Sequence, residues 1–567
     1  MAEKNCEHED IYEELDNKPE NVPLEGKSVT DYITGKLVKS GVKEHEKAVN
    51  VFARRLVEEL GYSKNQIQTI PQFRAKESPS GRPKYPVDIV VYHDEINKSY
   101  DNVYMIVECK QPNKKDGRNQ LDIYLNLVPS AEIGVWFNGK EHAYLWKVQD
   151  SKTKRPIWKE IPSIPKKGHR VEDIGHNLKK GLIVPGDLKS IFKDIRNHLA
   201  GTTTGITRDE TIAQQIINLL FCKIYDEINT PLDESVTFCA KASDTPKDVK
   251  KRIEDLFTKV KTQYNDVFDM NDTIDLDAKS VSYVVGELQD YIITKANRDA
   301  IAEAFEIFIG PALRGSEGQF FTPRNAIKLI IELIDPNIDE YIIDPACGSG
   351  GFLIAALEHV WTKLNEKAKN LGWSNETLVS ERIRLASKYI AGIDKDSFLA
   401  KVTKAYMALI GDGRGGIFCE NALNPPSEWS HKTRDKIKLG TFDVVVTNPP
   451  FGAKIAVKGE GEGKEILKQY DLAHKWKYED SKQIWEKTND LWDKQPPQIL
   501  FIERCLQLLK PHGRMAIILP ETYLHATNSQ YILSFLKRHK ILHIVDLSHN
   551  TFRPHNNAKT VVVILEK

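Results

Sequence analysis

The chain has 567 residues, and its 80 basic and 80 acidic residues give a formal net charge of zero. Hydrophobic residues make up 40% and charged residues 28%, as in a soluble globular protein of several domains. This balance excludes a basic surface over the whole chain, so any nucleic-acid contact must come from a local patch. No apolar run has the length of a membrane span, and the polar, acidic start is unlike a signal peptide.

The seven cysteines are scattered, odd in number and without the paired spacing of a zinc site. We therefore expect reduced thiols and a cytoplasmic location.

Residues 1–27 are rich in Glu, Asp, Asn and Pro, and this composition predicts a flexible tail. Apolar residues then recur at helical spacing up to Leu60, and Gly61 is placed to end that helix. Glu46 lies in the first turns of the predicted helix.

Two predicted strands, 86–92 and 103–110, follow on either side of a polar turn. Side chains two apart on a strand share a face, so Glu108 and Lys110 point the same way, and Asp88 lies beside them if the strands pair. Two carboxylates can hold Mg²⁺ through oxygen ligands, and the metal would activate water against a phosphodiester. Lys110 would orient that water or stabilise the developing charge.

These residues resemble the PD-(D/E)xK nucleases, in the form found at the N-terminus of type I restriction subunits. Pro86-Val87-Asp88 and Glu108-Cys109-Lys110 match the metal motif, Gln120-Leu121-Asp122-Ile123-Tyr124 matches the following helix, and Glu46 fits the acid of the first helix. The resemblance implies an α/β nuclease-like domain over 28–150, with Mg²⁺ on Asp88 and Glu108, and Glu46 and Gln120 as further catalytic residues. The alternative is an inactive domain that binds DNA or a partner, because a fold match does not prove cleavage.

The segments 131–137 and 143–147 are expected to complete the nuclease sheet as two strands around the Asn138-Gly139 turn. Prolines and lysines dominate residues 151–205, and we interpret this segment as a solvated linker. Amphipathic patterns then predict an all-helical connector over 206–315.

From residue 316 to 567, predicted strands alternate with predicted helices, which favours a doubly wound, Rossmann-like sheet with ligands at the carboxyl ends of its strands. The stretch from Asp344 to Phe352 joins a buried strand to a helix through glycines that let the backbone approach a nucleotide-like cofactor. Asp394 ends the next predicted strand, where an acidic residue usually takes ribose hydroxyls.

A further buried strand, 442–447, ends in Asn448-Pro449-Pro450-Phe451. A prolyl pair cannot continue a central strand, so the chain must turn there and expose its polar atoms.

Together with Gly318–Arg324, these motifs resemble the adenine-N6 DNA methyltransferases that use S-adenosylmethionine, in particular the methyltransferase subunit of type I restriction-modification systems and the fused type IIG enzymes. The resemblance implies that Asn448, Pro449, Pro450 and Phe451 hold an adenine extruded from the duplex. It also implies a set of cofactor-binding residues: Gln319, Phe320, Phe321, Thr322, Pro323, Arg324, Asp344, Cys347, Gly348, Ser349, Gly350, Gly351, Asp394 and Asn421. Asn421 stands where the family often has an Asp.

Residues 452–497 are charged, and they are expected either to order over DNA or to form a disordered insertion. The whole pattern predicts a bifunctional restriction-modification subunit that methylates adenine in double-stranded DNA and cleaves DNA with Mg²⁺. Target recognition would come from an absent C-terminal domain or a separate specificity subunit. The alternatives are a methyltransferase with an inactive N-terminal domain, and a non-catalytic assembly module that holds the cofactor as a sensor.

Overall fold

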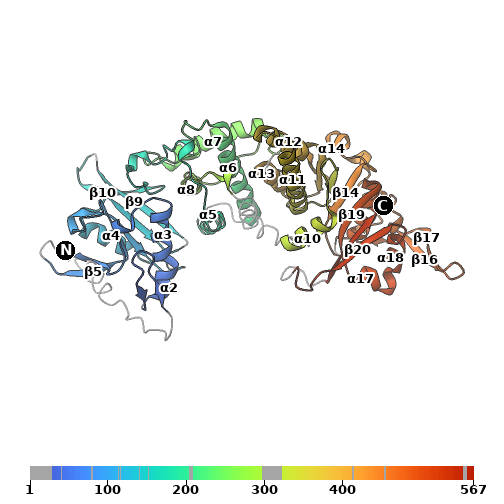
Figure 1. Cartoon of the computed structure of the whole chain (residues 1–567), viewed down its shortest axis with the longest axis horizontal. Helices are drawn as coiled ribbons and strands as arrows, with labels where there is room; N and C mark the ends of the chain where they lie inside the picture. Colours follow the sequence, from blue (N-terminus) through green and yellow to red (C-terminus); the bar gives the residue numbers. More distant parts are fainter. Residues whose placement is uncertain are drawn as a thin grey trace, which may run out of the picture. The chain divides into compact units, whose positions relative to one another are not determined.

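The computed structural model describes residues 28–296 and 322–567, apart from 40, 78–80, 113, 115, 140, 151, 204–207, 411–413, 453–454 and 553–558 (Figure 1). The predicted tail and the start of the Gly318–Arg324 motif lie outside the described residues. Packing divides the chain into two compact units. The first comprises Met1–Gly205, Tyr225–Leu256 and Asp275–Ala296, and the second comprises Ile206–Ile224, Phe257–Ile274 and Asn297–Lys567.

The first unit is built on a six-stranded sheet of order β10-β9-β8-β7-β6-β3. Its strands are β3 (Ile67–Gln68), β6 (Ile89–Tyr92), β7 (Val103–Cys109), β8 (Ile133–Phe137), β9 (His142–Gln149) and β10 (Pro156–Ile161). Only β7 and β8 run parallel among these neighbours, and α4 (Arg118–Leu127) connects them. The predicted pairing of the strands around Asp88 and Glu108 is therefore confirmed, with Ile89 opposite Val107.

Helices cover both faces of this sheet. Phe52 and Leu56 of α3 (Asn50–Glu58) pack against Met105 and other residues of one face. Leu121 of α4 packs with the opposite face. Alternation along the strands places successive side chains in these two cores. A short hairpin of β4 (Phe73–Lys76) and β5 (Pro83–Val87) extends this fold beside α4.

Residues 151–205, which the sequence predicted to be a solvated linker, form regular structure that packs on the sheet. This segment contains β10, which pairs along its length with β9, and α5 (Leu188–Thr202). Its buried residues Ile161, Ile164 and Val171 belong to the same core as α3. Prolines and lysines gave the segment a linker-like composition, but its few apolar residues are enough to fix it to the sheet.

The described part of the predicted connector contains only helices as its regular elements. They are α6 (Asp209–Asn229), α7 (Pro246–Gln263), α8 (Ala278–Leu288) and the short η6 (Ile293–Lys295). The boundary between the two units falls inside α6 and again inside α7.

The second unit carries a seven-stranded sheet of order β13-β12-β11-β14-β19-β21-β20. Its strands are β11 (Ile342–Asp344), β12 (Ile390–Asp394), β13 (Ile417–Cys419), β14 (Phe442–Thr447), β19 (Leu509–Pro520), β20 (Lys540–Asp546) and β21 (Thr560–Glu566). All neighbours are parallel except β21, which is antiparallel to both β19 and β20. The strand order reverses between β11 and β14, the place where open α/β sheets bind ligands.

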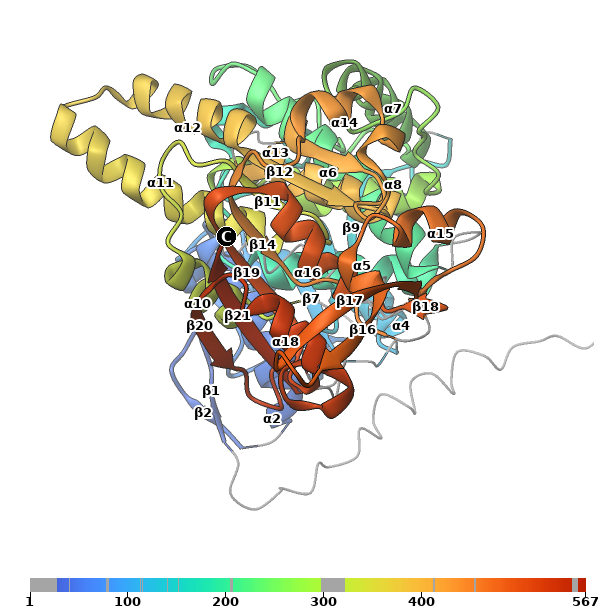
Figure 2. The ribbon, with the colours of Figure 1, turned by 90° about the vertical axis from the view of Figure 1, so that its right-hand side faces the viewer.

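Helices lie on both sides of this sheet, as the two views in Figures 1 and 2 show. Helices α16 (Pro497–Leu508) and α18 (Gln530–Leu536) pack against residues such as Val445 and Met515. Helices α10 (Arg324–Ile334) and α11 (Gly351–Leu371) lie on the other side. The remaining helices are α12 (Asn375–Tyr389), α13 (Ser397–Ile410), α14 (His431–Lys436) and α17 (Thr522–His525).

The charged segment after Phe451 is ordered in its described residues. It forms β15 (Val457–Lys458), α15 (Glu462–Leu467), β16 (His474–Glu479), β17 (Ile484–Leu491) and β18 (Lys494–Gln495). Trp476 of β16 is buried with Tyr531 and Phe535 of α18. Leu467, Tyr470, Leu472 and Ala473 of the same segment are buried in this core too, so several apolar side chains fix the insertion to the domain.

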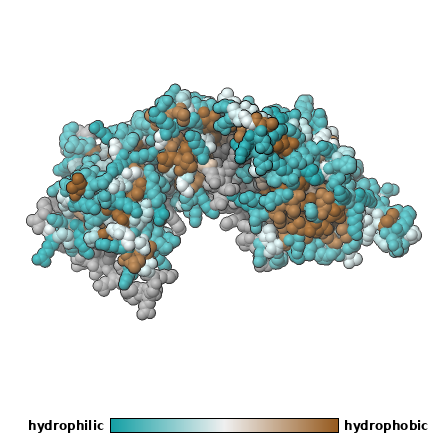
Figure 3. Space-filling model, in the orientation of Figure 1, coloured by the Kyte–Doolittle hydropathy of each residue, from teal (hydrophilic) through white to brown (hydrophobic). Residues whose placement is uncertain are grey.

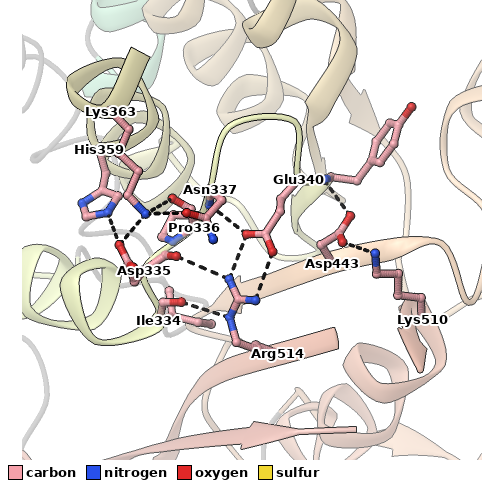
Figure 4. A network of polar contacts seen from close by, with 11 residues as sticks. Ile334, Asp335, Pro336, Asn337, Glu340, His359, Lys363, Asp443, Lys510 and Arg514 are labelled. Carbon is pink, nitrogen blue, oxygen red and sulfur yellow. Dashed lines mark hydrogen bonds and ion pairs between the residues drawn. The ribbon is translucent and has the colours of Figure 1, made fainter. Parts of the chain in front are cut away.

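A polar network fixes the amino ends of the central strands (Figure 4). The Arg514 guanidinium donates to the Glu340 carboxylate and to the backbone oxygens of Ile334 and Asp335. Lys363 contacts the Asp335 carboxylate at 2.6 Å. Because Asp335 ends α10, the network holds that helix to the end of the sheet opposite the strand ends Asp344 and Thr447.

The edge strand β20 is less well covered than the centre of the sheet. Figure 3 shows apolar side chains gathered over β20 and α10, where Ile544 is 51% and Leu329 is 40% exposed. Among the described residues, every helix is too short or too polar to cross a lipid bilayer.

Candidate active sites

The carboxyl ends of β11, β12 and β14 surround a cavity of about 190 Å³. Of the predicted site residues, the following line it: Thr322, Asp344, Cys347, Gly348, Ser349, Gly351, Asp394, Asn421, Asn448, Pro449, Pro450 and Phe451. Ser349 of the glycine turn and Asn448 of the prolyl turn therefore share one cleft, although about a hundred residues separate them in the sequence.

The glycine turn is bonded to the end of β12. The Gly348 N–H donates to the Asp394 carboxylate at 2.9 Å, and the Thr403 hydroxyl donates to the Gly348 carbonyl at 2.6 Å. Gly350 has a φ of +86°, and a Cβ there would lie 2.8 Å from the Thr403 side chain. This turn needs glycine both for its backbone angle and for the close approach of α13.

Burial raises the pKa of the two carboxylic acids that line the cavity. Asp344 is 1% exposed, and burial, aided by the nearby charge of Asp394, raises the pKa of Asp344 to about 7. Burial also raises the pKa of Asp394, against the lowering effect of the N–H groups of Asp396 and Gly348. Both carboxyl groups are therefore harder to ionise than exposed ones until a cation or further donors reach them.

In the side-chain amide of the catalytic candidate Asn448, the nitrogen has a hydrogen-bond partner and the oxygen has none among the described residues. Its Nδ2 donates to the Thr322 hydroxyl at 3.0 Å. Its Oδ1 is buried and has no hydrogen-bond partner among the described residues. A buried acceptor without a partner is costly, and this one lies in a residue that lines the cavity, so it suits a ligand amino group.

The other predicted cofactor residues differ in position. Pro323 and Arg324 begin α10 but do not line the cavity. Gln319, Phe320 and Phe321 lie outside the described residues. Asn421 lines the cavity, where its Oδ1 accepts the Leu423 N–H at 3.1 Å.

Several lining residues were not predicted from the sequence. Lys395 follows Asp394 directly, whereas Ile327 of α10, Val457 of β15 and Phe501 of α16 come from elements far apart in the chain. Only Lys395 had a local signal, its place after a strand-ending acid. The apolar residues have the pattern of ordinary core positions.

The second candidate site lies in the first unit, where β5 ends and β6 begins. Asp88 stands between these strands, and its two oxygens accept the Cys109 N–H at 2.8 Å and the Gln72 Nε2 at 3.1 Å. Lys110 and Glu108 form an ion pair, and the Glu108 side chain is fully buried. Asp88, Glu108 and Lys110 thus meet in one buried cluster.

Nearby carboxylates determine the protonation state of Lys110. Burial alone would lower its pKa, but the Glu108 carboxylate and the charges of Asp88 and Glu44 together raise it. Lys110 is therefore a cation that is held by carboxylates.

Two acids lie in the first turns of the first helical segment. Glu46 lies in a turn of π-helix, η1 (His45–Val49), and its side chain is exposed. Glu44, two residues earlier, is the acid whose charge acts on Lys110. Gln120 of α4 has a buried Oε1 without a hydrogen-bond partner among the described residues.

Metal-ligand geometry around Asp88 is incomplete. Among the described residues, no group of three His, Cys, Asp or Glu side chains is placed to hold a metal ion. Asp88 and Glu108 alone supply two carboxylates, which can be enough for Mg²⁺ because this ion keeps several waters.

Two family models match the chain. Residues 296–567 match the model described as N-6 DNA Methylase. Residues 45–165 match the model of the type I restriction enzyme R protein N terminus (HSDR_N). The two matches cover separate parts of the chain, one in each half.

The chain is also similar to named relatives. It is 29% identical over 260 residues to the type I restriction enzyme EcoEI methylase subunit of Escherichia coli, covering 45% of this chain and 43% of that protein. It is 23% identical over 273 residues to the type II restriction enzyme and methyltransferase RM.BcgI of Heyndrickxia coagulans, covering 47% of this chain and 34% of that protein. The chain thus spans less than half the length of these relatives. A solved chain from a type I R-M system has 20% identity and a TM-score of 0.45, covering 68% of this chain and 75% of that one.

Proposed function

We propose that the second unit transfers a methyl group from S-adenosylmethionine to the amino group of adenine in DNA. The buried, unpartnered Oδ1 of Asn448 carries this proposal, because it lies in a residue of the cavity that the glycine turn also lines. The match of residues 296–567 to the N-6 DNA Methylase model and the likeness to type I methylase subunits support it.

The chain's own residues fit the cofactor. The glycine turn offers backbone groups, Asp394 offers an acidic strand end, and Asp344 offers a buried carboxyl group within the same cavity. The sulfonium cofactor would supply an electrophilic methyl group when bound. No metal is required of the protein for this transfer.

The adenine amino group would be held by two acceptors of the prolyl turn. Asn448 Oδ1 and the Pro449 carbonyl oxygen would accept its two hydrogens, so that the nitrogen lone pair is available to the methyl group. The Thr322 hydroxyl accepts a hydrogen bond from Asn448 Nδ2. This contact orients the amide so that its oxygen is available to a ligand. Phe451 lines the cavity and would stack on the base, which must leave the duplex to reach this pocket.

The transfer is tested with tritiated cofactor and double-stranded DNA, supplemented with a specificity subunit where one is found. Asn448→Ala should lower the methylation rate by about 10²–10³-fold, as when one preorganised polar group of an active site is lost. The exposed Asn370 of α11 provides the matched control, and Asn370→Ala should leave the rate unchanged. Equal label from the wild type and Asn448→Ala would end the proposal.

A second candidate function is Mg²⁺-dependent DNA cleavage by the first unit. It is favoured by the cluster of Asp88, Glu108 and Lys110 and by the match of residues 45–165. Asp88 and Glu108 would hold the ion, and Lys110 would stand beside the scissile phosphate. The alternative is that this unit binds DNA or a partner without cleaving.

Calorimetric titration with Mg²⁺ separates these two cases. If the unit is a nuclease, Glu108→Gln should abolish both the binding heat and the nicking of supercoiled DNA. The exposed Glu132, at the opposite end of the sheet, serves as control, and Glu132→Gln should change neither. If Glu108→Gln still shows the binding heat of the wild type, Mg²⁺ does not bind at Glu108.

A further inference from the structure

The insertion that follows Phe451 carries a row of lysines on the outer side of the cavity wall. Val457 of β15 lines the cavity, and the next residue, Lys458, is exposed. Adjacent residues of a strand point to opposite faces, so Lys458 faces away from the cavity. The insertion therefore has an inner side at the proposed methyl-transfer site and an outer side that carries Lys458.

Strand pairing brings a second lysine directly beside the first. Lys458 of β15 lies opposite Lys494 of β18, while Val457 lies opposite the buried Gln495. Like charges directly opposite each other on a strand pair are destabilising. Among the described residues, neither lysine forms an ion pair, and both side chains are exposed.

An aromatic ring and a third lysine extend the row. Trp492 precedes Lys494 by two residues, and its side chain is 37% exposed. The Lys475 ammonium lies 5.9 Å from the centre of the Trp492 ring. We call Lys475, Trp492, Lys494 and Lys458 the lysine strip. In Figure 2, α15 and β16 to β18 lie together on one side of the domain.

The insertion is rigidly attached at the base of this strip. The Gln495 amide donates to the Leu472 carbonyl at 2.5 Å and to the Tyr531 hydroxyl at 3.2 Å. The Gly459 N–H donates to the Asp493 carbonyl at 2.8 Å. Lysines that are fixed by backbone pairing lose less freedom on binding an anion than lysines on a free loop.

We propose that the lysine strip binds backbone phosphates of the DNA whose adenine occupies the neighbouring cavity. This inference rests on the proposed function and names the residues that would hold the duplex. When a base leaves the stack, its phosphates remain outside the pocket, and the strip lies on the outer face of the strand that walls it. Because the whole chain is neutral, such a local row is the form that DNA attraction must take. The indole adds a face on which a base or sugar can pack.

The test measures binding of the full chain to a short fluorescent DNA duplex over a series of salt concentrations. Replacing Lys458 and Lys494 together by Ala should weaken binding about tenfold or more at low salt and reduce the log–log salt slope by about 2, since each phosphate contact contributes roughly 0.9. The double change to Arg should preserve both the affinity and the slope, because it keeps the charges. Affinity for S-adenosylhomocysteine should stay at the wild-type value in every variant, which verifies the fold.

Lys369 and Lys438 provide a matched control pair, because both are exposed lysines away from the cavity. Their double change to Ala should leave the salt slope at the wild-type value. An unchanged affinity and slope for the Lys458 and Lys494 pair, with wild type binding DNA, would overturn the proposal and leave an acidic protein surface as the occupant to test. A wild-type chain that binds DNA through the strip but transfers no label would instead refute the proposed methylation alone.

Discussion

The two candidate sites differ in how their polar groups are bonded. Around Asp88 and Glu108, the protein uses its own donors: Gln72 and the Cys109 N–H bind Asp88, and Lys110 pairs with Glu108. In the cavity of the second unit, the Asn448 oxygen is left without a protein partner. In the first site these groups bind one another, although the Gln120 Oε1 is also buried without a partner among the described residues; in the second site the unpartnered acceptor belongs to a residue that lines a cavity.

This difference separates a site that contributes to stability from one that is prepared for binding. A ligand amino group can bind Asn448 without breaking an existing bond of its oxygen. At Asp88 and Glu108, the Gln72 amide and the Lys110 ammonium already contact carboxylate oxygens, although each carboxylate has further lone pairs.

The sharpest test of this comparison removes one half of the buried pair. Glu108→Ala leaves the Lys110 ammonium buried without its main counter-charge, and breaking such a pair costs about 3–5 kcal/mol. We expect that loss in the free energy of unfolding of the first unit, measured with urea. The double replacement Glu108→Leu with Lys110→Met should recover most of it. A loss below about 1 kcal/mol in Glu108→Ala would show that the Glu108–Lys110 ion pair does not stabilise the first unit.

The pH dependence of stability gives a smaller contrast within the cavity. Asp344 titrates at 3.8 when exposed and at about 7 when folded, so the folded state binds the proton more tightly. Its contribution is fully present below the unfolded pKa and is lost as the pH rises to about 7, by roughly 4 kcal/mol at most. Asp344→Asn should flatten the fall in stability of the second unit over that window, as followed by urea unfolding at several pH values. If stability fell with pH equally steeply in the wild type and in Asp344→Asn, a group other than Asp344 would cause the fall.

The smallest expected effect concerns the residue that orients Asn448. Thr322→Val removes the acceptor of the Asn448 Nδ2, and one such hydrogen bond is worth about 1 kcal/mol. We expect the methylation rate to fall about tenfold with cofactor affinity unchanged, because the amide can then turn its oxygen away. Thr322→Ser should retain the rate. If Ser and Val reduced the rate equally, Thr322 would act by packing alone.

The local motifs were predictable because their residues lie at strand ends within a few positions of one another. Asp344, Asp394 and Asn448 each end or follow a buried strand, and parallel strands end at the same edge of a sheet. The first-helix acid was not predictable to the residue. Glu46 lies in a π-helical turn with its side chain exposed, whereas the charge of Glu44 acts on Lys110.

The segment before α5 shows a different limit. Its composition resembled a linker, and only the pairing of β10 with β9 revealed that Ile161 and Val171 belong to a core. Pairing is a long-range choice that composition does not encode.

The amino-acid sequence by itself determined the two sets of strand-end polar residues and the turns that expose them, because turn chemistry and strand periodicity are local properties. The tertiary structure alone decided which of these groups have partners and which do not. It paired Asp88 with Gln72 and Glu108 with Lys110, left the Asn448 oxygen without a partner, and set Lys458 opposite Lys494 beside the cavity-lining Val457. The physical reason is that hydrogen bonds and charges are satisfied through space, by residues that only the packed chain brings together.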